Sequence, residues 1–211
     1  MTEPVRIDVE QDPVPIVLIL AATLRRAART PRLATAIGRV KGNVALKSTT
    51  DPQSATMRFG KGGVTVVRGV SPDTDVLIAA DLNTMADEKP PAPKVVGVAR
   101  HPKLAITVSK LLDPPHGTWQ QEAERFFAFA VQTPGVPRSL RIVCTDHGSE
   151  VVLGDPPIEY ELHGSEHALF NIFLGNTVLG QDLLDGKVFG VGKLAHLAGL
   201  TGRSLAWMLG Q

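Results

Sequence analysis

The spacing of apolar residues predicts a helix followed by strands in the first half of the chain. Residues 16–28 have helical spacing, and the helix ends before Pro31 because proline cannot continue the backbone hydrogen bonds. Residues 76–82 are also apolar and fit either a helix or a strand. The strands expected between these segments are residues 44–47, 55–59 and 64–67, the last two joined by the glycine-rich hairpin turn at 60–63.

The second half opens with a helix that has a clear start signal. Thr118 and Gln121 form a capping box, and apolar residues follow on one helical face until Pro134. The strands expected next are residues 140–145, 150–153 and 158–163. In the last of them, apolar residues 158, 160 and 162 alternate with polar residues 159, 161 and 163. One face of this sheet is therefore apolar, and helices must cover it.

The helices expected to cover that face lie in the last third of the chain. Ser165 caps a helix that Gly175 ends, and its apolar residues surround the helix instead of forming a stripe. Such a helix is either deeply buried or forms the wall of a cavity. A short helix at 178–184, a strand at 187–190 and a pair of helices at 194–209 complete the prediction.

The two halves share a sequence string as well as an order of elements. The string KVVGV at 94–98 returns as KVFGV at 187–191, and each is followed by Lys-Leu-Ala. Other landmarks recur at a similar offset, as Gly60 does at Gly154. We therefore expect a tandem, diverged duplication with repeats at 1–113 and 118–211, joined by a proline-containing linker.

Composition excludes several classes of protein. The chain has 211 residues, 43% of them hydrophobic, and a net charge of +1, which is too balanced for a protein whose main ligand is nucleic acid. The single cysteine, Cys144, lies in an apolar run and is expected to be a buried thiol. The first residues are acidic where an export signal would be basic, and the apolar run at 14–22 is too short to span a bilayer. We expect a cytoplasmic protein.

One stretch of the second half resembles a known family. Residues 158–175 (IEYELHGSEHALFNIFLG), then LLDGKV at 183–188, Gly190 and Leu194, resemble the C-terminal half of the sterol carrier protein type-two domain. The resemblance implies an α+β fold in which each repeat has a twisted, mostly antiparallel sheet with helices on one face. It also implies an apolar tunnel for sterols, fatty acids or acyl-CoA esters, which such proteins carry without transforming them.

The resemblance indicates which side chains would contact the ligand. The first repeat departs from it, because residues 83–93 are polar and rich in proline, and we expect its cavity to be reduced or lost. The ligand-binding residues carried over to the second repeat are Leu169, Phe170, Phe173, Leu174, Leu183, Leu184, Phe189, Leu205, Trp207 and Met208.

Two functions from different classes remain open. The first is non-catalytic lipid binding or transport, with no cofactor and no metal. The second is an accessory or scaffold module of the same fold, whose cavity is filled by its own side chains and which associates with a lipid-metabolic enzyme. An enzyme ranks third, because Glu159 and Glu161 fit a solvated sheet face and no serine has the surroundings of a nucleophile.

Three further motifs have a structural and a functional interpretation. His163 and His167 match the zinc motif H-x-x-E-H, but Gly164 and Ser165 favour a strand exit and a helix cap. The glycines around Lys61 faintly resemble a phosphate loop, but a hairpin fits their position between strands better. Basic residues from Arg25 to Lys41 complement helix dipoles, or alternatively contact anionic lipid headgroups at a membrane surface or the phosphates of an acyl-CoA.

Overall fold

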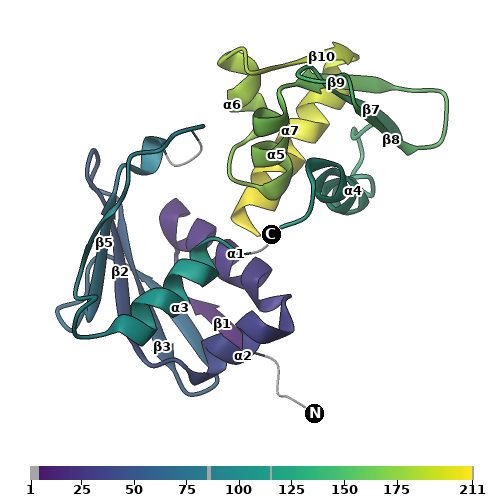
Figure 1. Ribbon diagram of the computed structural model, residues 1–211. Helices are drawn as coiled ribbons and strands as arrows, with labels where there is room; N and C mark the ends of the chain where they lie inside the picture. Colours follow the sequence, from purple (N-terminus) through teal and green to yellow (C-terminus); the bar gives the residue numbers. More distant parts are fainter. Residues whose placement is uncertain (1–4, 85–86, 115, 211) are drawn as a thin grey trace. The chain divides into compact units, whose positions relative to one another are not determined.

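The computed structural model describes residues 5–84, 87–114 and 116–210, and it divides into two compact units (Figure 1). Unit 1 extends to residue 115, and unit 2 begins at His116 and includes Leu209. Each unit contains a sheet and helices and has its own hydrophobic core. The predicted α+β class is therefore confirmed.

Unit 1 contains a mixed sheet of six strands. Its strands are β1 (Arg6–Val9), β2 (Gly42–Ser48), β3 (Ser54–Gly60), β4 (Gly63–Arg68), β5 (Val76–Ala80) and β6 (Lys94–Val96). They lie in the order β1-β4-β3-β2-β5-β6. Three of the pairings are antiparallel, whereas β1 with β4 and β2 with β5 are parallel. The apolar segment for which the sequence left helix or strand open is a strand, because β5 pairs with both β2 and β6.

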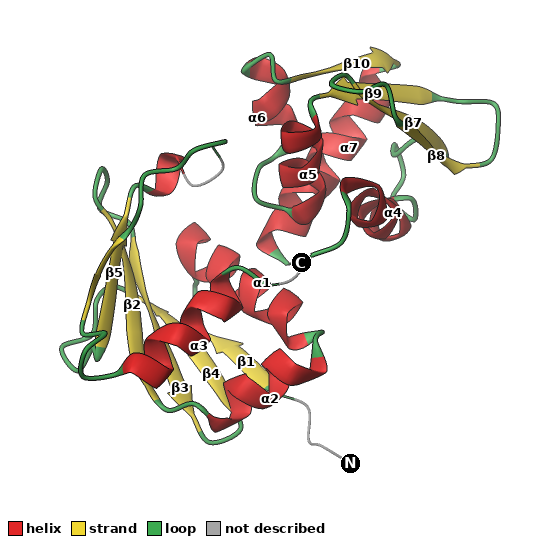
Figure 2. Cartoon of the chain, viewed as in Figure 1, coloured by secondary structure: helices red, strands yellow, loops and turns green. Residues whose placement is uncertain are grey.

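Helices cover one face of this sheet (Figure 2). They are α1 (Pro15–Ala28), α2 (Pro31–Arg39) and α3 (Pro102–Leu112), and the 3-10 turn η1 (Leu82–Thr84) follows β5. Each of the three α-helices has a proline in its first turn, where the missing N–H has no intrahelical partner to lose. Leu20 and Leu24 of α1 are buried against alternate residues of the strands, such as Met57 and Val66. The hydrophobic stripe of α1 is thus what fixes it to the sheet.

Unit 2 contains a four-stranded mixed sheet. Its strands are β7 (Ser139–Cys144), β8 (Glu150–Gly154), β9 (Tyr160–Gly164) and β10 (Val188–Gly192), in the order β10-β9-β7-β8. Only β7 and β9 pair in parallel. The alternation predicted for β9 is confirmed, since Tyr160 and Leu162 are buried and Glu161 and His163 lie on the other face.

Four helices pack on the apolar face of this second sheet: α4 (Trp119–Ala130), α5 (Glu166–Leu174), α6 (Leu179–Leu184) and α7 (Leu194–Leu209). Thr118 caps α4 through the predicted capping box. Ser165 caps α5, and Gly175 ends it in the left-handed conformation with φ of 77°. The predicted C-terminal pair of helices is wrong, because α7 is a single helix. Its residues Leu197, Leu200 and Trp207 lie on one continuous stripe against the core.

The two sheets share a four-strand arrangement. In unit 1 the order β3-β2-β5-β6 has antiparallel, parallel and antiparallel pairings in turn. In unit 2 the order β8-β7-β9-β10 has the same pairings in the same sequence. The corresponding edge strands, β6 and β10, contain part of the recurring KVVGV and KVFGV strings, since β6 ends at Val96 and β10 begins at Val188. Unit 1 differs by the additional strands β4 and β1, and by η1 where unit 2 has α5 and α6.

Candidate functional site

The candidate site of unit 2 is the layer in which α4, α5, α6 and α7 meet the apolar face of the sheet. Three aromatic rings pack together there: Phe126 of α4, Phe173 of α5 and Trp207 of α7. The Phe126 ring centroid lies 5.6 Å from that of Phe173 and 6.2 Å from that of Trp207. The Trp207 indole also donates a hydrogen bond of 2.7 Å to the backbone carbonyl of Phe173. This bond joins α7 to the last turn of α5, where carbonyls lack intrahelical partners.

The structure brings several of the predicted ligand residues into this layer. Leu169 and Phe173 are fully buried in the core of unit 2, and Phe170, Leu183 and Trp207 pack against it while partly exposed. Leu174 and Met208 are also partly exposed. These seven residues come from α5, α6 and α7, as the sequence predicted. Whether they contact a ligand stays a prediction.

The other three predicted residues lie at the surface. Leu184 is 85% exposed, Phe189 is 54% exposed and Leu205 is 44% exposed. Phe189 belongs to the outer face of the sheet, where its ring stacks on that of His163 at 4.6 Å. The strand alternation explains this difference, because Val188 and Gly190 take the positions on β10 that face the helices.

Tyr160 fills the space that a side chain on the inner face of β10 would otherwise occupy. A Cβ at Gly190 would lie 2.1 Å from the Tyr160 hydroxyl oxygen, and a Cβ at Gly192 would lie 2.5 Å from the Tyr160 ring. Burial raises the pKa of Tyr160 above its usual value of 10.0, since the interior disfavours the phenolate. Sequence reasoning did not select Tyr160 as a ligand residue, although its place on the apolar side of β9 was a usable signal.

A buried carboxylate holds the connection from α6 to β10. Asp182 is buried and accepts a hydrogen bond from the Thr177 hydroxyl at 2.5 Å. The ammonium of Lys187 lies 3.5 Å from Asp182 and 3.4 Å from Asp185. Burial opposes the charge on Lys187, but these two carboxylates outweigh it and raise the pKa of Lys187. Lys187 thus ties the LLDGKV segment to Asp182, the last residue before it, as well as to Asp185 within it.

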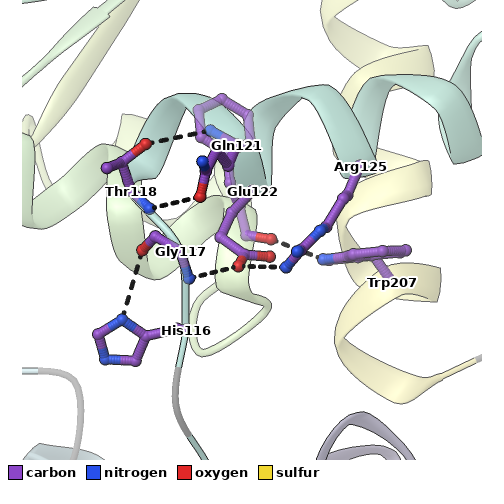
Figure 3. A network of polar contacts seen from close by, with 8 residues as sticks. His116, Gly117, Thr118, Gln121, Glu122, Arg125 and Trp207 are labelled. Atoms are coloured by element: carbon purple, nitrogen blue, oxygen red, sulfur yellow. Dashed lines mark hydrogen bonds and ion pairs between the residues drawn. The ribbon is translucent and has the colours of Figure 1, made fainter. Parts of the chain in front are cut away.

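A second polar network holds the start of α4 (Figure 3). The buried carboxylate of Glu122 accepts a hydrogen bond of 3.1 Å from the Gly117 backbone N–H and pairs with Arg125 at 2.6 Å. His116 makes an edge contact with Phe170 of α5, with ring centroids 4.5 Å apart. The residues before α4 are therefore anchored both to that helix and to α5.

The residues of unit 2 that the sequence also matched to other chemistry lie in separate elements or contact neighbouring side chains. His163 lies in β9 and His167 in α5, separated by the strand exit and helix cap that the sequence favoured over a zinc motif. Glu161 lies 3.7 Å from the Arg141 guanidinium. The thiol of Cys144 is buried, as expected, and lies 3.5 Å from His147 Nε2. Within the described residues, no group of three or more His, Cys, Asp or Glu side chains is arranged to hold a metal.

A hollow in unit 1 was not predicted. It has a volume of about 900 Å³ and lies between α2, β1 and the β3–β4 hairpin. None of the described residues in the segment 83–93, whose composition led us to expect a reduced cavity in the first half of the chain, lines this hollow. Two separate features of the sequence include residues that line the hollow: the basic residues before β2 and the glycines around Lys61. Only the fold places them together.

Among the described residues, no helix is both long enough and apolar enough to cross a membrane. No model of a known protein family matches the sequence, and neither does any curated protein. Among solved structures, the chain is similar to the crystal structure of sterol carrier protein 2, with a TM-score of 0.35 and 15% sequence identity. That match covers 45% of this chain and 91% of the other.

Proposed function

We propose that unit 2 binds the hydrocarbon part of a lipid, such as a sterol, a fatty acid or an acyl-CoA ester, without transforming it. The ligand would lie between the sheet and the helices α5, α6 and α7. Burial of its apolar surface would supply about 25 cal/mol per square ångström, so that few polar contacts are needed. As further parts of this proposal, the protein carries the lipid in the cytoplasm and makes weak contact with anionic membranes.

The observation that carries this proposal is the distribution of apolar residues around α5. Leu169, Ile172 and Phe173 face the core, and Phe170 and Leu174 extend the apolar surface to partly exposed positions. A helix of a small domain ordinarily has one apolar face and one polar face. An apolar ligand beside α5 would bury the partly exposed apolar surface formed by Phe170 and Leu174. The resemblance of residues 158–175 to a lipid-carrying domain agrees with this reading.

The aromatic cluster favours a second candidate function. Phe126, Phe173 and Trp207 pack against one another in the layer where the tunnel would run. A module whose interior is filled in this way would serve as an accessory or scaffold subunit, and its apolar surface would contact a lipid-metabolic enzyme. The shared order of four strands in the two units supports a further part of the proposal, that the chain is a tandem duplication.

Lipid binding can be tested directly on the purified chain. Native mass spectrometry, with lipid analysis of an organic extract, asks whether a lipid accompanies the protein. Titration with a fluorescent fatty acid then measures affinity. We expect a bound lipid and saturable binding of the probe. An empty protein that also fails to bind the probe would contradict the carrier function and leave the accessory role.

Surface variants locate the binding without disturbing the core. Leu184→Asn and Leu205→Asn change exposed residues of α6 and α7, and each is expected to weaken probe binding severalfold. Val191→Asn is the matched control, because Val191 is equally apolar and 56% exposed but lies on the outer face of β10. An equal loss in all three variants would contradict a site beside the helices.

A further inference from the structure

Four parts of unit 1 line its hollow. They are the start of β1, the end of α1, one face of α2, and the hairpin that joins β3 to β4. In Figure 2, α2 and β1 lie at the same side of this unit, next to β4. Apolar side chains such as Val5, Ala34 and Val64 form part of the wall. The hollow therefore offers both an apolar surface and, at its rim, charged groups.

The charges around the hollow are mostly positive. Four basic side chains line it, Arg6, Arg39, Arg58 and Lys61, against the single carboxylate of Asp8. The whole chain has a net charge of only +1, so this is a local concentration of positive charge. Such a concentration in a concave site attracts anions, because the low-dielectric walls focus the field.

Two of these cations are already engaged within the protein. The guanidinium of Arg6 lies 3.1 Å from Asp8, and Arg58 donates a hydrogen bond of 2.8 Å to the Ser71 hydroxyl. By contrast, the side chains of Arg39 and Lys61 make no hydrogen bond or ion pair with any residue in 5–84, 87–114 or 116–210. The helix dipole accounts for Arg39 at the end of α2, but it does not account for Lys61 in a hairpin.

Glycines keep the hollow open next to these two cations. A Cβ at Gly38 of α2 would meet no atom within 4 Å, and the same holds at Gly60 and Gly62 of the hairpin. Gly62, the second residue of the two-residue turn between Gly60 and Gly63, has φ of +83°, a left-handed conformation that favours glycine. The backbone of the turn is therefore accessible to a ligand held by Lys61.

We propose that the hollow of unit 1 binds a phosphate-bearing ligand through Arg39 and Lys61. A phosphate group carries more charge than a carboxylate and has several acceptor oxygens, so it can engage a guanidinium and an ammonium together. The apolar part of the wall would contact the organic body of the ligand. This site is independent of the lipid site proposed for unit 2. The phosphate can belong to a free phosphorylated molecule or to a lipid headgroup, and the two sources share the same chemistry.

The full chain can be tested with two defined probes. Titration calorimetry with inorganic pyrophosphate measures binding of a free phosphate compound. Flotation with phosphatidylcholine vesicles, with and without phosphatidic acid, measures binding of a headgroup. Lys61→Gln and Arg39→Gln are each expected to weaken binding by about tenfold, as expected for loss of a charge-assisted hydrogen bond. Their controls are Lys47→Gln and Arg32→Gln, which remove exposed basic residues outside the hollow.

A variant that fills the hollow tests the role of its open space separately from the role of its positive charge. Gly38→Leu places a side chain in the open space without removing a cation, and a helical glycine replaced by leucine should not destabilise α2. Gly202→Leu is the matched control, because Gly202 is also a helical glycine with no atom within 4 Å of its Cβ position, but it lies in α7 of unit 2. We expect Gly38→Leu to abolish binding and Gly202→Leu to retain it, with thermal unfolding confirming that both are folded.

The outcomes distinguish the sources and can overturn the proposal. Pyrophosphate binding that requires Arg39, Lys61 and Gly38 supports a free phosphorylated ligand. Binding only to vesicles with phosphatidic acid, with the same dependence, supports a headgroup. The proposal is overturned if neither probe binds, or if the control variants lose as much affinity as the hollow variants. Neither result depends on whether unit 2 carries a lipid.

Discussion

The hydroxyl of Tyr160 occupies the position that a side chain at Gly190 would need. A Cβ at Gly190 would lie 2.1 Å from the hydroxyl oxygen and 2.7 Å from the ring carbon that bears it. Gly190 is the glycine of the KVFGV string, and the glycine of the matching string in unit 1, Gly97, is also in close contact. A Cβ there would lie 2.1 Å from the Asp75 carbonyl oxygen. The repeated glycine therefore has a packing role in each unit.

Replacement of this glycine should destabilise unit 2. We expect Gly190→Ala to lower the free energy of unfolding by about 1–3 kcal/mol, because the new methyl group overpacks the core against Tyr160. Urea unfolding followed by tryptophan fluorescence measures this change, since both tryptophans of the chain, Trp119 and Trp207, belong to unit 2. The double variant Gly190→Ala with Tyr160→Phe removes the clashing hydroxyl and should recover part of the loss. Strictly additive effects of the two changes would contradict a direct clash.

Ionisation of Tyr160 should be delayed in the folded protein. Burial raises the pKa of Tyr160 above 10.0, and Tyr160 is the only tyrosine in the chain, so the ultraviolet absorbance of tyrosinate reports on it alone. Because the folded pKa exceeds the unfolded one, the stability from this group is complete below the unfolded pKa. It is lost as pH rises through the folded pKa. We expect a titration midpoint above 10.0 in the native protein and a return to about 10 in urea. A native midpoint at or below 10.0 would show that Tyr160 is not buried.

The network at the start of α4 gives a third prediction (Figure 3). Glu122→Ala leaves the Gly117 N–H without its acceptor and Arg125 without its partner, and we expect a loss of about 1–3 kcal/mol in the free energy of unfolding. Glu122→Gln keeps an acceptor oxygen and should cost less. Glu124→Ala is the control, because Glu124 is exposed on the same helix. Equal costs for the Glu122 and Glu124 variants, measured by urea unfolding, would disprove a structural role for the network.

The sequence pattern was sufficient to predict where a helix begins or ends when the signal lies within that helix and its flanking residues. The capping box at Thr118, the cap at Ser165 and the glycine stop at Gly175 all form as predicted. These signals act over three or four residues of backbone, and so they can be read without knowledge of the rest of the chain. The prediction of two C-terminal helices was wrong, since α7 continues unbroken through Gly199, where it packs closely on the backbone at Gly135.

The candidate sites depended more on the fold than on the sequence. Phe189 was expected beside a ligand, but the register of β10 with β9 turns it outward onto His163. A shift of one residue in a strand reverses the face of every side chain, and periodicity over five residues cannot fix that register. The hollow of unit 1 was missed for a related reason. Arg39 and Lys61 are far apart in the sequence, and only the packing of α2 beside the hairpin brings them to one hollow.

The sequence by itself determined the caps of α4 and α5, the apolar face of β9 and several of the helices and strands, because each depends on neighbouring residues and on their period. It did not predict β1, β6 or α3, and it left open whether residues 76–82 form a helix or a strand. The tertiary structure decided the strand order of both sheets, the outward position of Phe189, the contact of Tyr160 with Gly190, and the hollow of unit 1. These features arise from contacts between segments distant along the chain. Many pairings of such segments are compatible with the same local pattern, and only the packing of the whole unit selects one of them.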